Sequence, residues 1–370
     1  MRHAEIQVDL DAIRANVARL RAATTAEVMT VVKADAYGHG ALPVARAAVQ
    51  AGASWLGVCT LDEALALRAG GITAPVLAWL LVPGLPLHRG VEAGIDLSTS
   101  STGLLAELVE AARTAGRPAH VHLKIDTGLN RAGAKPADWP ALVEAAAKAQ
   151  ADGLIEVAGV WSHFAYADAP GHTTIDAQLS AFHDGLATAA RYGLRPRYRH
   201  LANSAATLTR PDTHFDLVRT GIATYGLSPI PGERFGLRPA MTVRATVLVT
   251  KRVPAGEGVS YGHTYTTSED TTLAVVPLGY GDGVPRHASN LGPVWLAGKR
   301  RTVAGRVCMD QVVLDCGDDP VSAGDVAVLF GPGDAGEPTA DDWADAIGTI
   351  NYEIVTRMSA IRVPRVYAGE

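Results

Sequence analysis

The sequence predicts a TIM-type (β/α)8 barrel followed by a second, β-rich domain. Eight short, β-prone apolar runs occur in the first 235 of the 370 residues, and Ala- and Leu-rich stretches that end near a glycine lie between them. Past about Phe235 the composition changes to Val- and Thr-rich segments separated by Gly and Pro turns. We therefore assign residues 1–235 to the barrel and 236–370 to the β-rich domain, with the first few residues free to pack on the latter.

The expected elements follow in chain order. An amphipathic helix opens the chain at residues 9–23. Barrel strands are expected at 28–33, 54–60, 75–81, 94–99, 119–126, 156–164, 197–203 and 215–219, and good helix formers predict helices at 42–50, 61–69, 103–115 and 173–192. In the second domain, β-prone runs predict strands at 240–253, 272–278, 293–296, 302–308, 311–314 and 325–330, and one helix at 340–347. In such barrels the chemistry lies where strands end and loops begin.

Composition and charge exclude several classes of protein. With 48% hydrophobic and 19% charged residues, the chain can form a packed core and is not globally disordered. Its formal net charge is -5 and its basic residues are scattered, which argues against binding nucleic acid by neutralising phosphates. The most apolar stretch, residues 75–82, is far shorter than a membrane span, and the N-terminus lacks the pattern of a signal peptide. The three cysteines form no C-x-x-C pair, so we expect a cytoplasmic protein.

A lysine stands at the end of the first expected barrel strand. Residues 31–40 read Val-Val-Lys-Ala-Asp-Ala-Tyr-Gly-His-Gly, which places Lys33 at the barrel mouth above Val31 and Val32. Burial there favours the neutral amine, a nucleophile that can bond to a carbonyl carbon. From position alone, a strand-end lysine with a solvated head group is the commoner alternative.

The end of the eighth expected strand has the features of a phosphate site. The strand ends at Arg219 and is followed by Gly221 and Ile222. Barrels commonly bind a phosphate on backbone N–H groups after this strand. The sequence therefore predicts an anion site at the same mouth as Lys33.

Several motifs in order resemble the alanine racemases, the fold-type III pyridoxal-phosphate enzymes. Besides residues 31–40, they are Leu-Lys-Ile-Asp-Thr-Gly-Leu-Asn-Arg-Ala-Gly (123–133), Ser-His-Phe-Ala (162–165), Asn-Ser-Ala (203–205), Val-Arg-Thr-Gly-Ile (218–222), Val-Ser-Tyr-Gly (259–262), Gly-Arg-Val-Cys-Met-Asp (305–310) and Asn-Tyr-Glu (351–353). The resemblance implies an isomerase that interconverts L- and D-alanine with pyridoxal 5'-phosphate and supplies D-alanine for peptidoglycan precursors. Serine is expected as a secondary substrate.

The resemblance also implies which residues bind the cofactor. They are Lys33, Tyr37, Asn203, Ser204, Arg219, Gly221, Ile222 and Tyr352. The two backbone amides at 221 and 222 and the three hydroxyls would hold the phosphate, although Ser204 or Tyr352 alone could equally be a cap or a packed core residue. Arg219 would face the pyridine nitrogen, and a permanent cation there keeps the ring neutral and restrains side reactions. Taken alone, Arg219 could also form a surface salt bridge.

A second catalytic base is implied at Tyr261, with Arg131 and His163 beside its phenol. Ionising a phenol at neutral pH costs about 4 kcal/mol, and a guanidinium at ~4 Å supplies a comparable amount. Lys124 resembles the lysine that is often carbamylated in this family: a carbamate would orient Arg131, whereas a free ammonium would repel it.

The resemblance further implies a homodimer with shared active sites. Tyr261 lies in the β-rich domain, and family members place this tyrosine opposite the lysine of the other chain. Met309 and Asp310 would come from the same second chain and bind substrate together with Arg131. Several members carry a tyrosine where this chain has Val284, at a position that lines the substrate entry channel with Arg306. A looser gate to that channel, or one rebuilt by Tyr166, is therefore expected.

Two alternative functions match parts of the sequence. Residues 258–262, Gly-Val-Ser-Tyr-Gly, satisfy the G-x-S-x-G pattern of serine hydrolases, but a Thr-rich, β-prone stretch follows where that motif requires a helix. A barrel that carries pyridoxal phosphate without turnover would lack the second domain, and fold-related decarboxylases lack a tyrosine base like Tyr261.

A metal-dependent barrel hydrolase is a further alternative. His120-x-His122-x-Lys124 places three side chains on one face of a strand, and His163 and His200 could be additional ligands. An arginine, however, stands where such a site needs an Asp after the last strand. Packed histidines are the commoner reading, and we expect no metal.

Overall fold

Eight parallel strands form the predicted barrel in this computed structural model, which describes residues 2–358 and 361–369. The strands are β2 (Glu27–Val31), β3 (Trp55–Val58), β4 (Val76–Ala78), β5 (Asp96–Thr99), β6 (Ala119–Lys124), β7 (Ile155–Trp161), β8 (Tyr198–His200) and β9 (Leu217–Thr220). They pair in the order β8-β7-β6-β5-β4-β3-β2-β9. Two backbone hydrogen bonds, from Asp216 N–H to Arg199 O (3.1 Å) and from Arg219 N–H to Ala202 O (3.0 Å), close the seam between β8 and β9.

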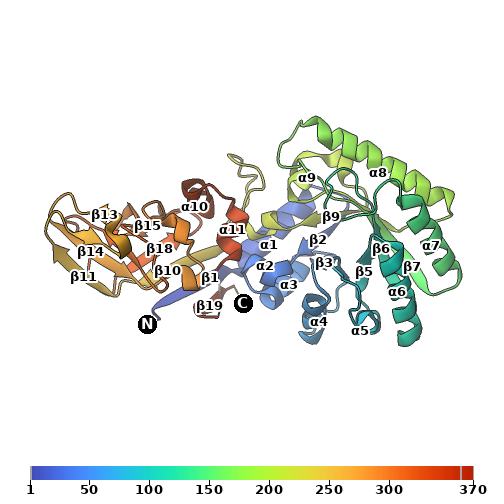
Figure 1. The fold of residues 1–370 in the computed structure, drawn as a ribbon, viewed down its shortest axis with the longest axis horizontal. Coiled ribbons are helices and arrows are strands. Elements are labelled where there is room, and N and C mark those ends of the chain that lie inside the picture. The colour runs from blue at the N-terminus through green and yellow to red at the C-terminus, as the bar shows by residue number, and fades with distance from the viewer. Residues whose placement is uncertain (1, 359–360, 370) are drawn as a thin grey trace.

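Helices cover the outside of the barrel (Figure 1). They are α1 (Leu10–Ala22), α3 (Ala41–Gln50), α4 (Leu61–Ala69), α5 (Leu87–Glu92), α6 (Thr102–Ala115), α7 (Trp139–Ala151) and α8 (Thr173–Arg191), with the short α2 (Lys33–Tyr37) and α9 (Ser204–Thr209) at the mouth. Helix α6 shows how the sequence sets their bounds. The Ser101 hydroxyl caps its N-terminus, Gly116 ends it in the left-handed conformation, and Leu105 and Leu108 lie on its buried face.

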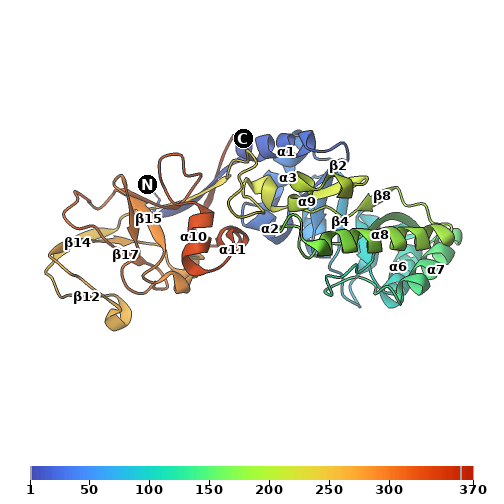
Figure 2. The same ribbon diagram turned by 90° about the horizontal axis from the view of Figure 1, so that it is seen from above.

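The second part of the chain, together with the N-terminal strand β1, forms a six-stranded sheet, a three-stranded sheet and a two-stranded sheet. The first contains β1 (Ala4–Asp9), β10 (Met241–Thr246), β15 (Pro293–Leu296), β16 (Lys299–Thr302), β18 (Val326–Phe330) and β19 (Arg365–Ala368); the second contains β11 (Val249–Val253), β14 (Thr271–Val276) and β17 (Val312–Asp315); the third contains β12 (Gly258–Val259) and β13 (Tyr265–Thr266). Helices α10 (Ala340–Ile347) and α11 (Asn351–Thr356) return toward the barrel, and α11 lies beside α2 in both views (Figures 1 and 2).

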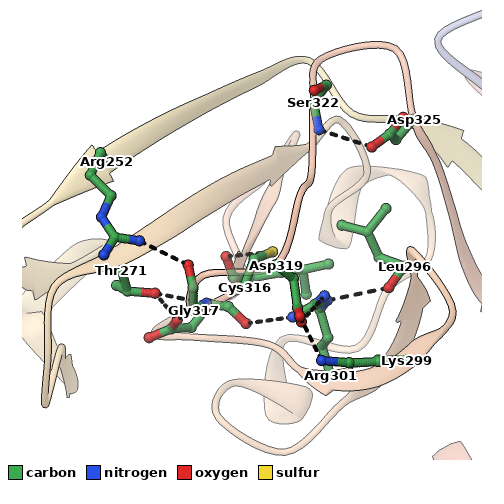
Figure 3. Close-up of polar contacts among 12 residues, drawn as sticks. Arg252, Thr271, Leu296, Lys299, Arg301, Cys316, Gly317, Asp319, Ser322 and Asp325 are labelled. Carbon is green, nitrogen blue, oxygen red and sulfur yellow. Dashed lines mark hydrogen bonds and ion pairs between the residues drawn. The ribbon is translucent and has the colours of Figure 1, made fainter.

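Polar contacts hold the connection after β17 to the neighbouring strands (Figure 3). The Asp319 carboxylate accepts from Lys299 Nζ (2.5 Å) and from Arg301 Nη2 (2.8 Å). Gly317 N–H donates to the Thr271 hydroxyl (2.9 Å), and Arg252 donates to Gly317 O (3.1 Å). These contacts fix the connection to the neighbouring strands.

Three expected elements differ in the structure. Strand β2 ends at Val31, so Lys33 is not its last residue but begins α2, because the chain after Val32 adopts a left-handed conformation that cannot continue a strand. The expected strand at 240–253 is two strands in different sheets, since adjacent residues Val247 and Leu248 donate their N–H groups to Asp325 O and Val275 O. No strand spans 302–308, where Gly305 has a φ of +81°.

The sequence interpretation also missed several elements, among them β1, β19, α5, α7 and α11. Strand β1 pairs with β10 antiparallel and with β19 parallel, so the beginning of the chain lies in the sheet of the second part. Buried and half-buried residues alternate along β1, and the matching alternation of apolar and polar residues is visible in its sequence. Within the described residues, no helix has the length and apolar character to cross a membrane.

Candidate active site

A cavity of about 610 Å³ lies at the carboxyl ends of the barrel strands. The structure brings the predicted barrel residues together there with Tyr352 from α11. The predicted residues that line it are Lys33, Tyr37, Lys124, Arg131, His163, Asn203, Ser204, Arg219, Gly221, Ile222 and Tyr352. Lys33 and Tyr352, which are 319 positions apart in sequence, therefore meet at one opening, with Trp79 and Trp161 as further walls.

Lys33 is presented by an unusual left-handed turn. Ala34, Asp35, Ala36 and Tyr37 all have φ between 52° and 54°. Each non-glycine residue in this conformation costs roughly 1–2 kcal/mol, so surrounding contacts must hold the turn. Gly38 follows at a φ of +83°, and a Cβ there would lie 2.4 Å from Val355 O, so only glycine fits against α11.

The contacts that hold this turn come from both parts of the chain. The Glu63 carboxylate at the start of α4 accepts from Ala34 N–H (2.7 Å) and Cys59 N–H (2.8 Å). The Asp35 carboxylate accepts from Ala41 N–H (2.8 Å) and also pairs with Arg365 of β19. Lys33 is consequently fixed at the cavity by the barrel on one side and by the β-rich part on the other.

Hydroxyl groups gather at one end of the cavity. The Ser204 Oγ accepts from Gly221 N–H (2.9 Å), and a Cβ at Gly221 would lie 2.4 Å from the Tyr37 hydroxyl oxygen, so the backbone approaches that phenol closely. Burial raises the pKa of both Tyr37 and Tyr352 above the usual range of a phenol, with nearby Tyr352 and Asp168 respectively adding to the effect. Both phenols stay protonated at neutral pH and can donate to an anion.

Arg219, on β9, is buried and donates hydrogen bonds in several directions. Its Nη2 donates to Ser162 O (2.8 Å), to Leu201 O (3.2 Å) and to His163 Nδ1 (3.1 Å). Burial lowers the pKa of Arg219 to about 9, so the guanidinium remains charged at neutral pH. Its central carbon lies 4.8 Å from the Trp161 ring centroid.

His163 is kept neutral by its surroundings. Burial, followed by the positive charges of Arg219 and Arg131, lowers the pKa of His163 well below its usual value. Because Arg219 donates to Nδ1, the single proton of the neutral ring is on Nε2. His163 therefore presents an N–H donor on the side away from Arg219.

Lys124, the last residue of β6, is buried beside two cations. Its Nζ lies 4.3 Å from the Trp161 ring centroid. Burial, together with Arg219 and Arg131, lowers the pKa of Lys124 to about 8. A neutral amine is thus accessible near neutral pH, which is the form that reacts with CO2.

The residues expected from a second chain do not reach this cavity in their own chain. Tyr261 begins a 3-10 turn (Tyr261–His263) in the β-rich part and is 70% exposed, and Met309 is 53% exposed. Asp310 pairs with Arg362 (2.5 Å). Their side chains are available at the surface of this chain.

The expectation for Val284 is wrong. Val284 is 1% exposed and packs in the core of the β-rich part, so it cannot line an opening. The exposed aromatic residue of that segment is Tyr280, at 40% exposure. Tyr280 begins a 3-10 turn (Tyr280–Asp282).

The two alternative sites are not formed by the described residues. Ser260 donates its hydroxyl to Arg306 O (2.7 Å) and precedes a three-residue 3-10 turn instead of an α-helix. His122 uses both ring nitrogens in hydrogen bonds, with Asp96 (3.1 Å) and His200 (2.9 Å). In the described part of the chain, no group of three or more His, Cys, Asp or Glu residues is placed to hold a metal.

Sequence reasoning missed Glu63, which holds the turn after Lys33, and Asp96, which pairs with His122 in the barrel interior. Glu63 was detectable, because Thr60-x-x-Glu63 is a capping-box pattern at the start of α4. Asp96 carried only the weak signal of a carboxylate between two apolar residues in an expected strand.

Comparisons with known proteins identify the family of this chain. Residues 8–229 match the family described as alanine racemase, N-terminal domain, and residues 240–367 match alanine racemase, C-terminal domain. The alanine racemase of Salinispora arenicola is 72% identical over 100% of both chains, and that of Thermobifida fusca is 61% identical over 99% of this chain and 98% of its own. The alanine racemase structure from the D-cycloserine producer Streptomyces lavendulae has a TM-score of 0.99 at 56% identity, covering 100% of this chain and 98% of that one. The chain belongs to the alanine racemase family of enzymes.

Proposed function

We propose that this chain racemises alanine with pyridoxal 5'-phosphate as cofactor, using Lys33 of one subunit and Tyr261 of the partner subunit as two bases. The observation that carries the proposal is the lining of the cavity: a fixed lysine, a buried guanidinium and protonated hydroxyls converge there. We further infer that the D-alanine it makes supplies peptidoglycan precursors.

The donor set of the cavity fits a phosphorylated pyridine aldehyde. The amine of Lys33 would bond covalently to the aldehyde carbon. The hydroxyls of Tyr37, Ser204 and Tyr352 and the backbone N–H groups of Gly221 and Ile222 would hold the phosphate, with Asn203 placing Ser204 by capping α9 (Asn203 Oδ1 to Ala206 N, 3.1 Å). When bound, the cofactor supplies an electron-withdrawing ring that weakens the Cα–H bond of an amino acid.

Arg219 would contact the ring nitrogen. A guanidinium has no acceptor and stays charged, so it donates a hydrogen bond to the nitrogen and disfavours its protonation. Ring electron withdrawal is thereby moderated, which favours return of the proton to Cα over other outcomes.

Two bases are required because inversion removes a proton from one face of Cα and returns it to the other. Lys33 would serve one face. Tyr261 would serve the other, with its phenol beside Arg131 and His163 of the facing subunit. The exposure of Tyr261 and Met309 in a single chain supports donation of these residues to a second copy, and Asp310 would join them in binding substrate with Arg131.

Lys124 is proposed to act as a carbamate. The neutral Lys124 amine would form an N–C bond to CO2 and lose one proton to solvent, and the resulting carbamate anion would replace cation–cation repulsion with an ion pair to Arg131. Arg131 would then be oriented for the substrate carboxylate.

The test is incubation of the purified protein with L-alanine, followed by chiral analysis with and without added pyridoxal 5'-phosphate. Cofactor-dependent appearance of D-alanine is expected. Borohydride reduction and peptide mapping should then find the pyridoxyl group on Lys33. Lys124 lines the same cavity and is the internal control, and label on Lys124 in place of Lys33 would contradict the assignment.

A further inference from the structure

A continuous chain of hydrogen-bonded side chains crosses the barrel interior and ends at Arg219. Arg219 Nη1 lies 3.2 Å from His200 Nδ1, and His200 Nε2 lies 2.9 Å from His122 Nδ1. His122 Nε2 lies 3.1 Å from the Asp96 carboxylate. Asp96 begins β5 and His122, His200 and Arg219 lie on β6, β8 and β9, so four strands contribute to one line of contacts.

Only one arrangement of protons satisfies every contact in this chain. Arg219 can only donate, so His200 Nδ1 accepts and the proton of a neutral His200 is on Nε2. That N–H requires His122 Nδ1 to accept, which places the His122 proton on Nε2, directed at Asp96. The carboxylate can only accept, so it completes the series.

Because these side chains are buried, water cannot replace any of them as a hydrogen-bond partner. His122 and His200 are 0% exposed and Asp96 is 5% exposed. A Cβ at Gly159 would lie 2.3 Å from His122 Nδ1, so only glycine at that position leaves space for the ring. The Trp161 ring stacks on His200 at 5.5 Å between centroids and 4° between planes.

The surroundings of Asp96 and His200 set the charges of these two side chains. Burial alone would raise the pKa of Asp96, but hydrogen bonds from His120 and His122 outweigh it and hold that pKa at about 2. Burial and the charge of Arg219 lower the pKa of His200 well below its usual value, so this ring is neutral. His120, whose side chain is 44% exposed, lies 3.5 Å from the other Asp96 oxygen.

We propose that Asp96 is a positioning residue for Arg219: acting through His122 and His200, its carboxylate selects the tautomers that leave His200 Nδ1 free to accept from the guanidinium. The consequence for catalysis rests on the proposed function, in which Arg219 contacts the cofactor ring. Without the acceptor at position 96, His122 would turn its proton toward His200, and His200 would present N–H to the N–H of Arg219. The guanidinium would then lose one of the contacts that orient it.

Histidine tautomers can be measured directly by 15N NMR of the full-length protein labelled at histidine, with and without pyridoxal 5'-phosphate. Single His→Gln variants assign the signals. In the wild type, His122 and His200 should both carry their proton on Nε2. A His200 proton on Nδ1 would overturn the inference, whatever the activity of the enzyme.

Two substitutions at Asp96 separate positioning from general packing. Asp96→Leu removes the acceptor and should give mixed tautomers at both histidines, with kcat lowered by about tenfold, the size of effect seen when an outer-shell hydrogen-bond partner is lost. KM for alanine should change little. Asp96→Asn restores a weaker, uncharged acceptor and should recover most of the single tautomer and part of kcat, and it also serves if the Leu variant does not fold.

The same two changes at Asp216 are the matched controls, because Asp216 pairs with Arg199 (2.7 Å) on the other face of β8. They should leave the tautomers of His122 and His200 unchanged. Wild-type tautomers and kcat in Asp96→Leu, or a fully wild-type kcat in Asp96→Asn if the Leu variant is unfolded, would overturn the proposal. Absence of racemisation in the wild type would instead contradict the proposed function and leave the tautomer result standing.

Discussion

The Glu63 carboxylate accepts a hydrogen bond of 2.7 Å from the backbone N–H of Ala34, the residue next to Lys33. The same side chain completes the capping box of α4 by accepting from Thr60 N–H (3.0 Å). One carboxylate therefore joins the start of a helix to the left-handed turn that presents the lysine. Since that turn is intrinsically unfavourable, its geometry depends on such outside contacts.

Replacing this carboxylate should loosen the turn. In Glu63→Gln the amide has one acceptor oxygen in place of two, so at least one of the N–H groups of Ala34, Cys59 and Thr60 loses its partner. Loss of a hydrogen bond to a charged group corresponds to about 1.5–3 kcal/mol, so we expect affinity for pyridoxal 5'-phosphate to fall by at least about tenfold. Fluorescence or absorbance titration of the cofactor measures this.

The control for that experiment is Asp62→Asn, the same chemical change on the exposed face of the same helix. Its cofactor affinity should equal that of the wild type. Equal affinity in Glu63→Gln as well would mean that the turn holds its shape without this contact.

Mixing two inactive variants tests the shared site. Lys33→Ala and Tyr261→Phe subunits, unfolded together and refolded, should recover up to about a quarter of wild-type activity, because half of the dimers are hybrids with one intact site. Each variant refolded alone is the control and should stay inactive. No recovery, with hybrids demonstrated by mass spectrometry, would place both bases in one chain.

Deuterium exchange distinguishes the two bases. We assign Lys33 to the α-proton of D-alanine and Tyr261 to that of L-alanine. Tyr261→Phe should therefore abolish racemisation but still exchange the α-proton of D-alanine with D2O, more slowly than the wild type, and should leave L-alanine nearly unlabelled. Mass spectrometry of the separated enantiomers gives the result, and equal labelling of both would exclude a two-base mechanism.

Carbamate formation on Lys124 should increase with pH. Only the neutral amine reacts with CO2, and the pKa of Lys124 is lowered to about 8 by burial with help from Arg219 and Arg131. The neutral fraction therefore rises as the pH passes through 8. In 13C-bicarbonate, a protein-bound carbamate signal should grow between pH 7 and 9 by 13C NMR. Lys124→Met is the control, and a signal of the same size in that variant would assign the carbamate elsewhere.

The protein should lose stability as the pH falls below about 6.5, which is well above the usual pKa of a carboxyl group. Burial lowers the pKa of His39 to about 4, whereas an unfolded histidine titrates near 6.5. Between these values the unfolded state binds more protons, so the free energy of unfolding falls as the pH falls. The expected loss from His39 alone is about 3 kcal/mol between pH 6.5 and 4.

Urea unfolding at a series of pH values checks this slope. In His39→Gln the amide can replace the hydrogen bond from the ring to Ala36 O (3.1 Å) but does not titrate, so the dependence should be shallower by one proton. An identical pH dependence in wild type and variant would show that His39 does not contribute.

Much of the site was predictable because its residues lie in local motifs. The strand-to-loop position of Lys33 and the Arg219-x-Gly221 sequence at the last strand are visible in short segments, whereas Asn203 and Ser204 were indicated only by a motif that resembles the alanine racemases. The alternation of apolar runs and helix formers likewise predicts the barrel and the separate β-rich part, since burial of one face sets that periodicity.

Only the tertiary structure decided the hydrogen-bond partners, backbone conformation and protonation of residues that contact distant parts of the chain. No local pattern indicates that Asp96 is joined to Arg219 through two histidines, because the four residues meet only when strands β5, β6, β8 and β9 close around them. The left-handed turn after Val32 is similarly not a local preference, since its residues are not glycine and its shape is held by Glu63 and Arg365 from other elements. The sequence by itself determined the alternation of strands and helices in the barrel and the motifs that carry its mouth residues. The closed barrel decided the protonation and orientation of those side chains, because both depend on burial and on contacts between distant strands.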